Sequence, residues 1–138
     1  MGLYLTVFDN DEEEVDGIEI GYYADFNYFR DTIVDKLENG NPGSCFPTLI
    51  LHSDCDGEWS PTDAGKLEEE IKCISDQFKN MPPIVLNSEW KKKVAYDFGI
   101  NPQNLYDCFF DIDGEPLLER LLRLVRISQE RGVPILFQ

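Results

Sequence analysis

Residues 49–61, LILHSDCDGEWSP, gather side chains that bind metals and transfer protons. The stretch contains the chain's single histidine, His52, together with the carboxylates of Asp54, Asp56 and Glu58. In an extended strand, alternate residues face the same side, so these four groups could present one imidazole and three carboxylates to a divalent cation. This arrangement would suit a metal-dependent hydrolase.

Two other interpretations explain the same residues. Gly57 and a helix start at Ser60 leave little room for a strand to continue, and a turn would scatter the four groups. In the structural interpretation, His52 ends a strand and Trp59 packs beside the helix start. In the binding interpretation, the loop displays its carboxylates and Trp59 to a basic partner, since loops on rigid scaffolds often carry binding groups. The metal interpretation is disfavoured because short motifs of this kind are common by chance.

The charge of the chain favours a basic partner. There are 27 acidic and 12 basic residues, for a formal net charge of −15, which argues against nucleic acid or an anionic membrane as the partner. Residues 1–65 hold 15 of the acidic residues but only 2 of the basic ones. We therefore expect an acidic binding surface. The hypothesis assigns to it Asp54, Asp56, Glu58, Trp59, Asp9, Asp11, Glu12, Glu13 and Glu14.

Other signatures of enzymes and exported proteins are missing from the sequence. It has no G-x-S-x-G motif and no glycine-rich phosphate loop. With His52 as its single histidine, it has no second histidine on which a catalytic triad could rest. Its four cysteines form no C-x-x-C pair, and no cationic leader or apolar run of about 18 residues is present. We expect a cytoplasmic protein that is not an enzyme and uses neither cofactor nor metal. Residues 111–116 are interpreted as a turn and helix cap.

Hydrophobic periodicity predicts four strands and four helices. The strands are expected at residues 3–9, 18–23, 48–52 and 134–137, and the helices at residues 23–38, 61–78, 88–98 and 115–131. Ser60 and Asp63 are expected to cap the second helix reciprocally. The third helix is expected to bury Trp90, Val94 and Phe98 and to expose Lys91, Lys92 and Lys93. The last helix is expected to bury Leu117, Leu118, Leu121, Leu122, Leu124 and Val125 and to expose Arg120, Arg123 and Arg126.

These elements predict one compact domain over residues 1–138, of the α/β or α+β class. A small mixed sheet of about four strands would pack with about four helices. Because residues 48–51 are uninterruptedly apolar, they are expected to form a central strand covered by helices on both faces.

Several long strings resemble the immunity protein 70 family of bacterial polymorphic toxin systems. They are MGLYLTVFD, YADFNYFRD, FPTLILHSDCDGEWSP, LYDCFFDIDGEPLLERLL and RGVPILFQ, and together they span nearly the whole chain. The resemblance implies a small cytosolic protein that binds and neutralises the toxin domain of a cognate effector. It supplies no catalytic or metal-binding residues. The acidity of the chain agrees with a basic toxin, such as a nuclease. The alternatives are a metal-dependent hydrolase that uses the cluster around His52 and an acidic adaptor.

Overall fold

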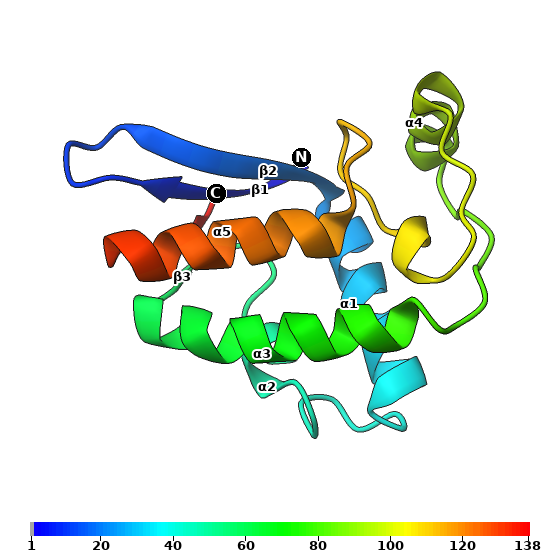
Figure 1. Ribbon diagram of the computed structural model, residues 1–138, viewed down its shortest axis with the longest axis horizontal. Helices are drawn as coiled ribbons and strands as arrows, with labels where there is room; N and C mark the ends of the chain where they lie inside the picture. The colour runs from blue at the N-terminus through cyan, green and yellow to red at the C-terminus, as the bar shows by residue number, and fades with distance from the viewer. Residues whose placement is uncertain (1) are drawn as a thin grey trace.

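A four-stranded antiparallel sheet organises the protein (Figure 1). The computed structural model describes residues 2–138. Its strands are β1 (Gly2–Phe8), β2 (Glu14–Tyr22), β3 (Glu58–Trp59) and β4 (Ile135–Phe137), in the spatial order β2-β1-β4-β3. The chain is therefore a compact α+β domain, which confirms the predicted class, although every strand pair is antiparallel where a mixed sheet was expected.

The main helices lie on one side of this sheet (Figure 1). They are α1 (Tyr23–Leu37), α3 (Pro61–Phe78) and α5 (Leu117–Arg131), accompanied by the short α2 (Pro47–Ile50), by α4 (Glu89–Phe98) and by the 3-10 turn η1 (Tyr106–Cys108). In β1, Leu3, Leu5 and Val7 are fully buried. On the opposite face Tyr4 and Phe8 are partly exposed, whereas Thr6 between them is buried and donates a hydrogen bond to Glu14. The expectation of helices on both faces is wrong, because the sheet has one core face and one open face.

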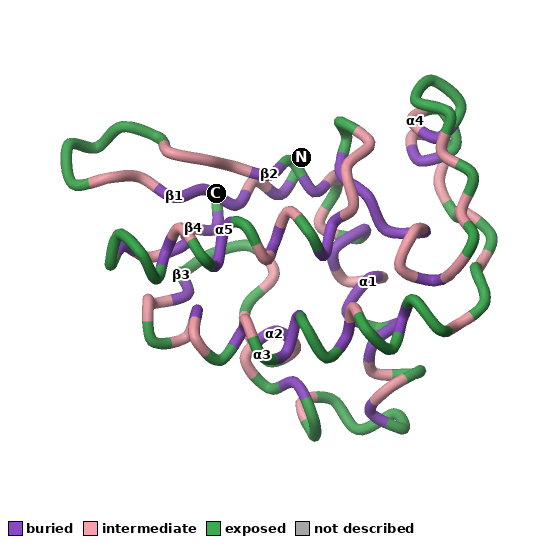
Figure 2. The backbone as a smooth tube through the Cα atoms, viewed as in Figure 1, coloured by how far each residue is buried: buried purple, intermediate pink, exposed green. Residues whose placement is uncertain are grey.

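The hydrophobic core fills the space between the sheet and α1, α3 and α5 (Figure 2). The apolar stripe of α3 is buried: Ala64, Leu67, Ile71, Ile74 and Phe78. Five of the six apolar residues predicted to be buried on α5 are in the core, and the sixth, Leu122, packs partly against it.

Local signals correctly marked the helix ends. The Ser60 hydroxyl accepts a hydrogen bond from the Asp63 amide at 3.1 Å, and the Asp63 carboxylate accepts one from the Ser60 amide at 3.1 Å. These reciprocal bonds satisfy donors that a helix start leaves free. Gly99 and Gly132 adopt the left-handed conformation that ends α4 and α5.

The predicted strand at residues 48–52 is instead the helix α2 and the bend after it. Periodicity cannot separate a short buried strand from a short buried helix, and Pro47 stands at the first helical turn, where proline is favoured. The third strand is the two-residue β3, which pairs with β4 through Glu58 and Trp59.

Three charged or aromatic side chains lie opposite to expectation. Lys91 is only 3% exposed, with its Nζ 5.3 Å from the ring centre of Phe109, whereas Phe98 is 61% exposed. The short α4 packs beside the end of the sheet. The side of α4 that faces the core carries Lys91 and not Phe98. Arg120 is also largely buried, because it forms ion pairs with Asp16 and Glu115.

The buried stripe of α5 can be tested at Leu121. Replacing Leu121 by Ala should lower the free energy of unfolding by about 2–5 kcal/mol, because the change loses apolar burial and leaves a cavity. Chemical denaturation measures this difference. A change below about 0.5 kcal/mol would contradict the placement, since exposed positions usually stay within that range.

Candidate partner-binding surface

Buried charged side chains from α1 and α3 hold the irregular segment at residues 38–59. Glu38, at the end of α1, accepts hydrogen bonds from the amides of Gly43, Cys45 and Phe46 at 3.1, 2.8 and 2.8 Å. A buried amide without a partner is costly, so one carboxylate that satisfies three amides fixes the path of this loop.

The short helix α2 is held in the same way at both ends. The Glu70 carboxylate on α3 accepts hydrogen bonds from the amides of Thr48 and Leu49 at 3.2 and 3.0 Å. At the other end, the Arg30 guanidinium donates to the carbonyls of Leu49, Ile50 and His52. An anion at the amino end and a cation at the carboxyl end both complement the helix dipole. Burial lowers the pKa of Arg30.

His52 has a structural role in this segment. Its Nδ1 and Nε2 lie 2.9 Å from the backbone carbonyl oxygens of Ser53 and Glu58, and its ring stacks on Phe137 with a centroid distance of 4.2 Å. Backbone carbonyl oxygens thus occupy the approach to both ring nitrogens, and a neutral imidazole can donate to only one of them.

The carboxylates near His52 do not converge on it. Asp54 accepts a hydrogen bond from the Asn27 side chain at 2.7 Å, which is the main cause of the lowered pKa of Asp54. Asp56 and Glu58 are exposed. Across residues 2–138, the structure shows no group of three or more His, Cys, Asp or Glu side chains that could hold a metal ion.

Trp59 lies in the core. Its side chain is 2% exposed, contacts Phe137 edge-on at 4.7 Å between ring centres, and donates from Nε1 to the Thr48 carbonyl at 3.1 Å. This tryptophan joins β3, β4 and α2, so it offers no surface to a partner in the folded protein. Of the residues near His52 in the binding hypothesis, Asp56 and Glu58 are exposed, Asp54 is half-buried and Trp59 is buried.

The other acidic segment forms the tip of the β1–β2 hairpin. Asp9 closes the turn, because its Oδ1 accepts hydrogen bonds from the amides of Asp11 and Glu13 at 2.9 and 3.0 Å. The side chains of Asp11, Glu12 and Glu13 are exposed. Asp9 is therefore a structural residue of the turn, and its neighbours project three carboxylates into solvent.

The open face of the sheet connects the two acidic segments. One row of paired residues crosses all four strands and consists of Gly17, Thr6, Leu136 and Glu58. In the first two strands, Tyr4 pairs with Glu19 beside that row. Since alternate residues share a face, Glu19 and Glu58 project away from the core. We name the open acidic face as Glu14, Glu19 and Glu58 together with the hairpin-tip acids Asp11, Glu12 and Glu13.

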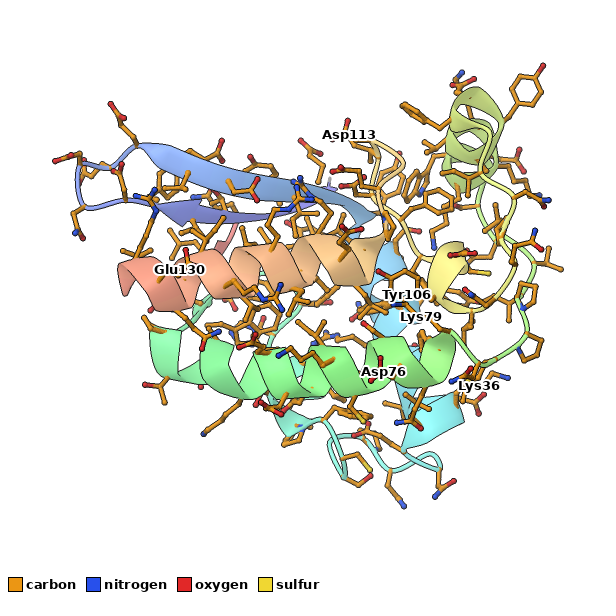
Figure 3. All side chains as sticks on the ribbon, in the orientation of Figure 1. Lys36, Asp76, Lys79, Tyr106, Asp113 and Glu130 are labelled. Atoms are coloured by element: carbon orange, nitrogen blue, oxygen red, sulfur yellow. The ribbon has the colours of Figure 1, made fainter. Side chains whose placement is uncertain are left out.

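No lysine or arginine lies in β1, β2, β3 or β4, or in the connections from 9 to 13 and from 38 to 60. Every lysine and arginine is on α1, α3, α4 or α5, except Lys79, which caps the end of α3. There Lys79 rests on the Tyr106 ring, 4.7 Å from its centre (Figure 3). The fold thus places basic residues on the helices and leaves the open acidic face without them.

Glu14 anchors the centre of the open acidic face. Its Oε1 accepts hydrogen bonds from the hydroxyls of Tyr4 and Thr6 at 2.6 and 2.7 Å. Both bonds lower the pKa of Glu14. The bond between Tyr4 and Glu14 is also the main cause that raises the pKa of Tyr4 to about 12. The Tyr4 hydroxyl lies where a side chain at Gly17 would begin, so a larger residue there would displace the tyrosine that bonds to Glu14.

Sequence reasoning missed Glu19, Glu38, Glu70 and Arg30. A signal existed for two of them: Arg30 lies four residues after Phe26, and Glu70 three after Leu67, so both fall on the buried sides of their helices. A charge on such a stripe indicates a buried partner. Glu19 could be recognised only after the open face was known.

The protein is an α+β domain, and one face of its sheet carries acids that project away from the core. The family model of immunity protein 70 matches residues 3–137. The chain therefore belongs to the immunity protein 70 family, and its general role is that of an immunity protein. Searches of curated proteins and of solved structures found no match. Across residues 2–138, no helix is long and apolar enough to cross a membrane.

The anchoring role of Glu70 predicts a large difference between neighbouring glutamates. Glu70→Ala should lower the free energy of unfolding by about 2–5 kcal/mol, since each buried donor left without an acceptor costs about 1–3 kcal/mol. The exposed neighbour Glu69 provides the matched control, and Glu69→Ala should change stability by less than about 0.5 kcal/mol. Equal effects in urea denaturation would contradict the role of Glu70.

The bond between Tyr4 and Glu14 predicts a shift that NMR can follow. In Tyr4→Phe, the pKa of Glu14 should rise towards its ordinary value of 4.5, because its main hydrogen bond is lost. In the unaltered protein, the stabilisation from this carboxylate is complete above pH 4.5 and is lost as the pH falls through the lowered pKa. Titration of the carboxyl carbon measures the pKa, and denaturation at several pH values measures the loss of stability. Tyr96→Phe should leave the Glu14 titration unchanged; an equal shift in the two variants would refute the assignment.

Proposed function

We propose that this protein binds the toxin domain of a cognate polymorphic toxin in the cytoplasm of the producing cell and neutralises it by forming a stoichiometric complex. The toxin domain is basic, for example a basic nuclease, and it contacts the open acidic face. The protein catalyses no reaction in this role. The observation that carries the proposal is an uncovered sheet face with acids from two distant segments and no lysine or arginine, in a chain of the immunity protein 70 family.

Electrostatics explains why such a face would suit an inhibitor. Complementary charge accelerates encounter and disfavours wrong partners, and an inhibitor must reach its toxin before damage occurs. The exposed acids of the face make few bonds within the protein: neither Glu19 nor Glu58 forms a side-chain ion pair among the described residues. Their charge is therefore available to a partner. Asp56, exposed beside Glu58, extends the face.

The hydrolase alternative has little support from the geometry. Both ring nitrogens of His52 contact backbone carbonyls, and Asp54 is bonded to Asn27, so the proposed cluster does not assemble. An adaptor with another partner would use the same face, and a direct binding experiment separates it from an immunity protein.

The binding experiment uses the toxin domain encoded beside the gene for this chain. The two proteins should co-purify as a stable complex, and an equimolar amount of this protein should abolish the toxin's activity. Full toxin activity in the presence of excess folded protein would overturn the proposal.

Charge neutralisation tests whether the open acidic face is the contact surface. The triple variant Glu13→Gln, Glu19→Gln and Glu58→Gln should slow association with the toxin domain about tenfold or more at low salt, with a smaller effect on dissociation. Steering of this kind weakens as salt rises. Surface plasmon resonance at several salt concentrations measures both rates.

The matched control removes the same charge from the helices. Asp35, Asp76 and Glu130 are exposed acids on α1, α3 and α5, and Asp76 and Glu130 are labelled in Figure 3. The triple variant Asp35→Asn, Asp76→Asn and Glu130→Gln should slow association much less. If both triple variants slow association equally, net charge alone is responsible and the open acidic face is not the contact surface.

A further inference from the structure

An apolar groove of about 370 Å³ lies between the end of β2 and α4. Its apolar lining consists of Tyr22, Trp90, Val94, Phe98 and Ile112. Tyr22 is 58% exposed and Phe98 is 61% exposed, and Ile112 is also exposed. Isolated exposed apolar residues are ordinary, but several that gather around one concave site mark a place where another molecule binds.

The groove is held open by its framework. Trp90 donates from Nε1 to the Asp25 carboxylate at 3.0 Å, and the same carboxylate oxygen accepts the Tyr22 amide at 2.8 Å. This shared acceptor ties the α4 tryptophan to the start of α1. Gly21, with a φ of 125°, leaves the space where Trp90 lies. A groove fixed in this way requires little ordering when a ligand enters it.

The mouth of the groove continues the open acidic face. Glu19 lines the groove and belongs to that face, and its carboxylate has no ion-pair partner among the described residues. Lys93 and Asp97 also line the groove, and they pair with each other at 2.9 Å. The available charge at the mouth is therefore negative, and it stands next to apolar walls.

An added β-strand does not fit this site. The free edge of β2 is already covered there, because the Gly17 carbonyl accepts a hydrogen bond from Arg120 and the Glu19 carbonyl accepts one from the Ile112 amide at 3.3 Å. A partner must therefore bind through side chains. A second copy of this chain is disfavoured, since each copy carries a net charge of −15.

We propose that the groove receives an apolar side chain from a protruding segment of the basic toxin domain, while a lysine or arginine beside it pairs with Glu19. This inference rests on the proposed function and identifies where the complex is anchored. The open acidic face steers the encounter, and the groove slows dissociation. Buried aromatic and aliphatic contacts near a desolvated ion pair are typical of residues that dominate binding energy.

Two neighbouring aromatic residues on α4 allow a matched test. Phe98→Ala removes one wall of the groove, whereas Tyr96→Ala removes a side chain that is 88% exposed and does not line it. Val94→Glu, which places a charge inside the groove, is the second groove variant. Each variant is first checked by circular dichroism and thermal unfolding, and Val94→Glu preserves the test if Phe98→Ala fails to fold.

Binding is measured with the toxin domain encoded beside the gene for this chain. The groove variants should bind at least about tenfold more weakly, mainly through faster dissociation, and Tyr96→Ala should bind within about threefold of the unaltered protein. If the unaltered protein binds the toxin and folded Val94→Glu binds equally well, the groove inference is overturned while the proposed function stands. If the unaltered protein does not bind the toxin, both fall. Concentration-dependent dimerisation that Val94→Glu abolishes would identify a second copy as the occupant and would also overturn the inference.

Discussion

Hydrogen bonding by buried charged side chains is the constraint on which the rest of this structure depends. Between α1 and α3 the chain runs through the irregular residues 38–59, and Glu38, Arg30 and Glu70 supply the partners that a strand pairing would otherwise provide. This segment delivers Glu58 and Trp59 to the edge of β4. Without this segment, the sheet would lose β3 and the core would lose the indole of Trp59.

The same arrangement separates the charges of the molecule. Charged side chains that face inward, such as Glu70 and Arg30, are used to hold backbone groups, and the basic residues lie on helices. All the charged residues of the strands are acids, and no helix covers one side of their sheet (Figure 1). The surface that we propose for a basic partner thus follows from the way the fold divides its charged residues, and the apolar groove lies at one end of it.

Much of the fold could be predicted from the sequence, because local signals and tertiary packing agree there. The capping pair Ser60 and Asp63 and the apolar stripe of α3 indicate the same helix. Residues 48–50 were predicted as a strand but lie in α2, because so short a run suits a strand or a helix and the deciding partners, Glu70 and Arg30, are distant in sequence. The interpretation of Trp59 was open for the same reason: its neighbours Phe137 and Thr48 come from other segments. The acidity of the first half was visible, but Glu19 joins Glu58 only when strand order is known.

Hydrogen–deuterium exchange of the complex with the toxin domain tests the central claim most directly. We expect slower exchange on binding in the hairpin tip at residues 9–13, in residues 53–57 and in α4, which surround the open acidic face and its groove. The solvent-facing amides at the ends of α3 and α5 should exchange as they do in the free protein. Protection confined to α3 and α5, with residues 9–13 and α4 unchanged, would contradict the account and place the toxin on the helical side.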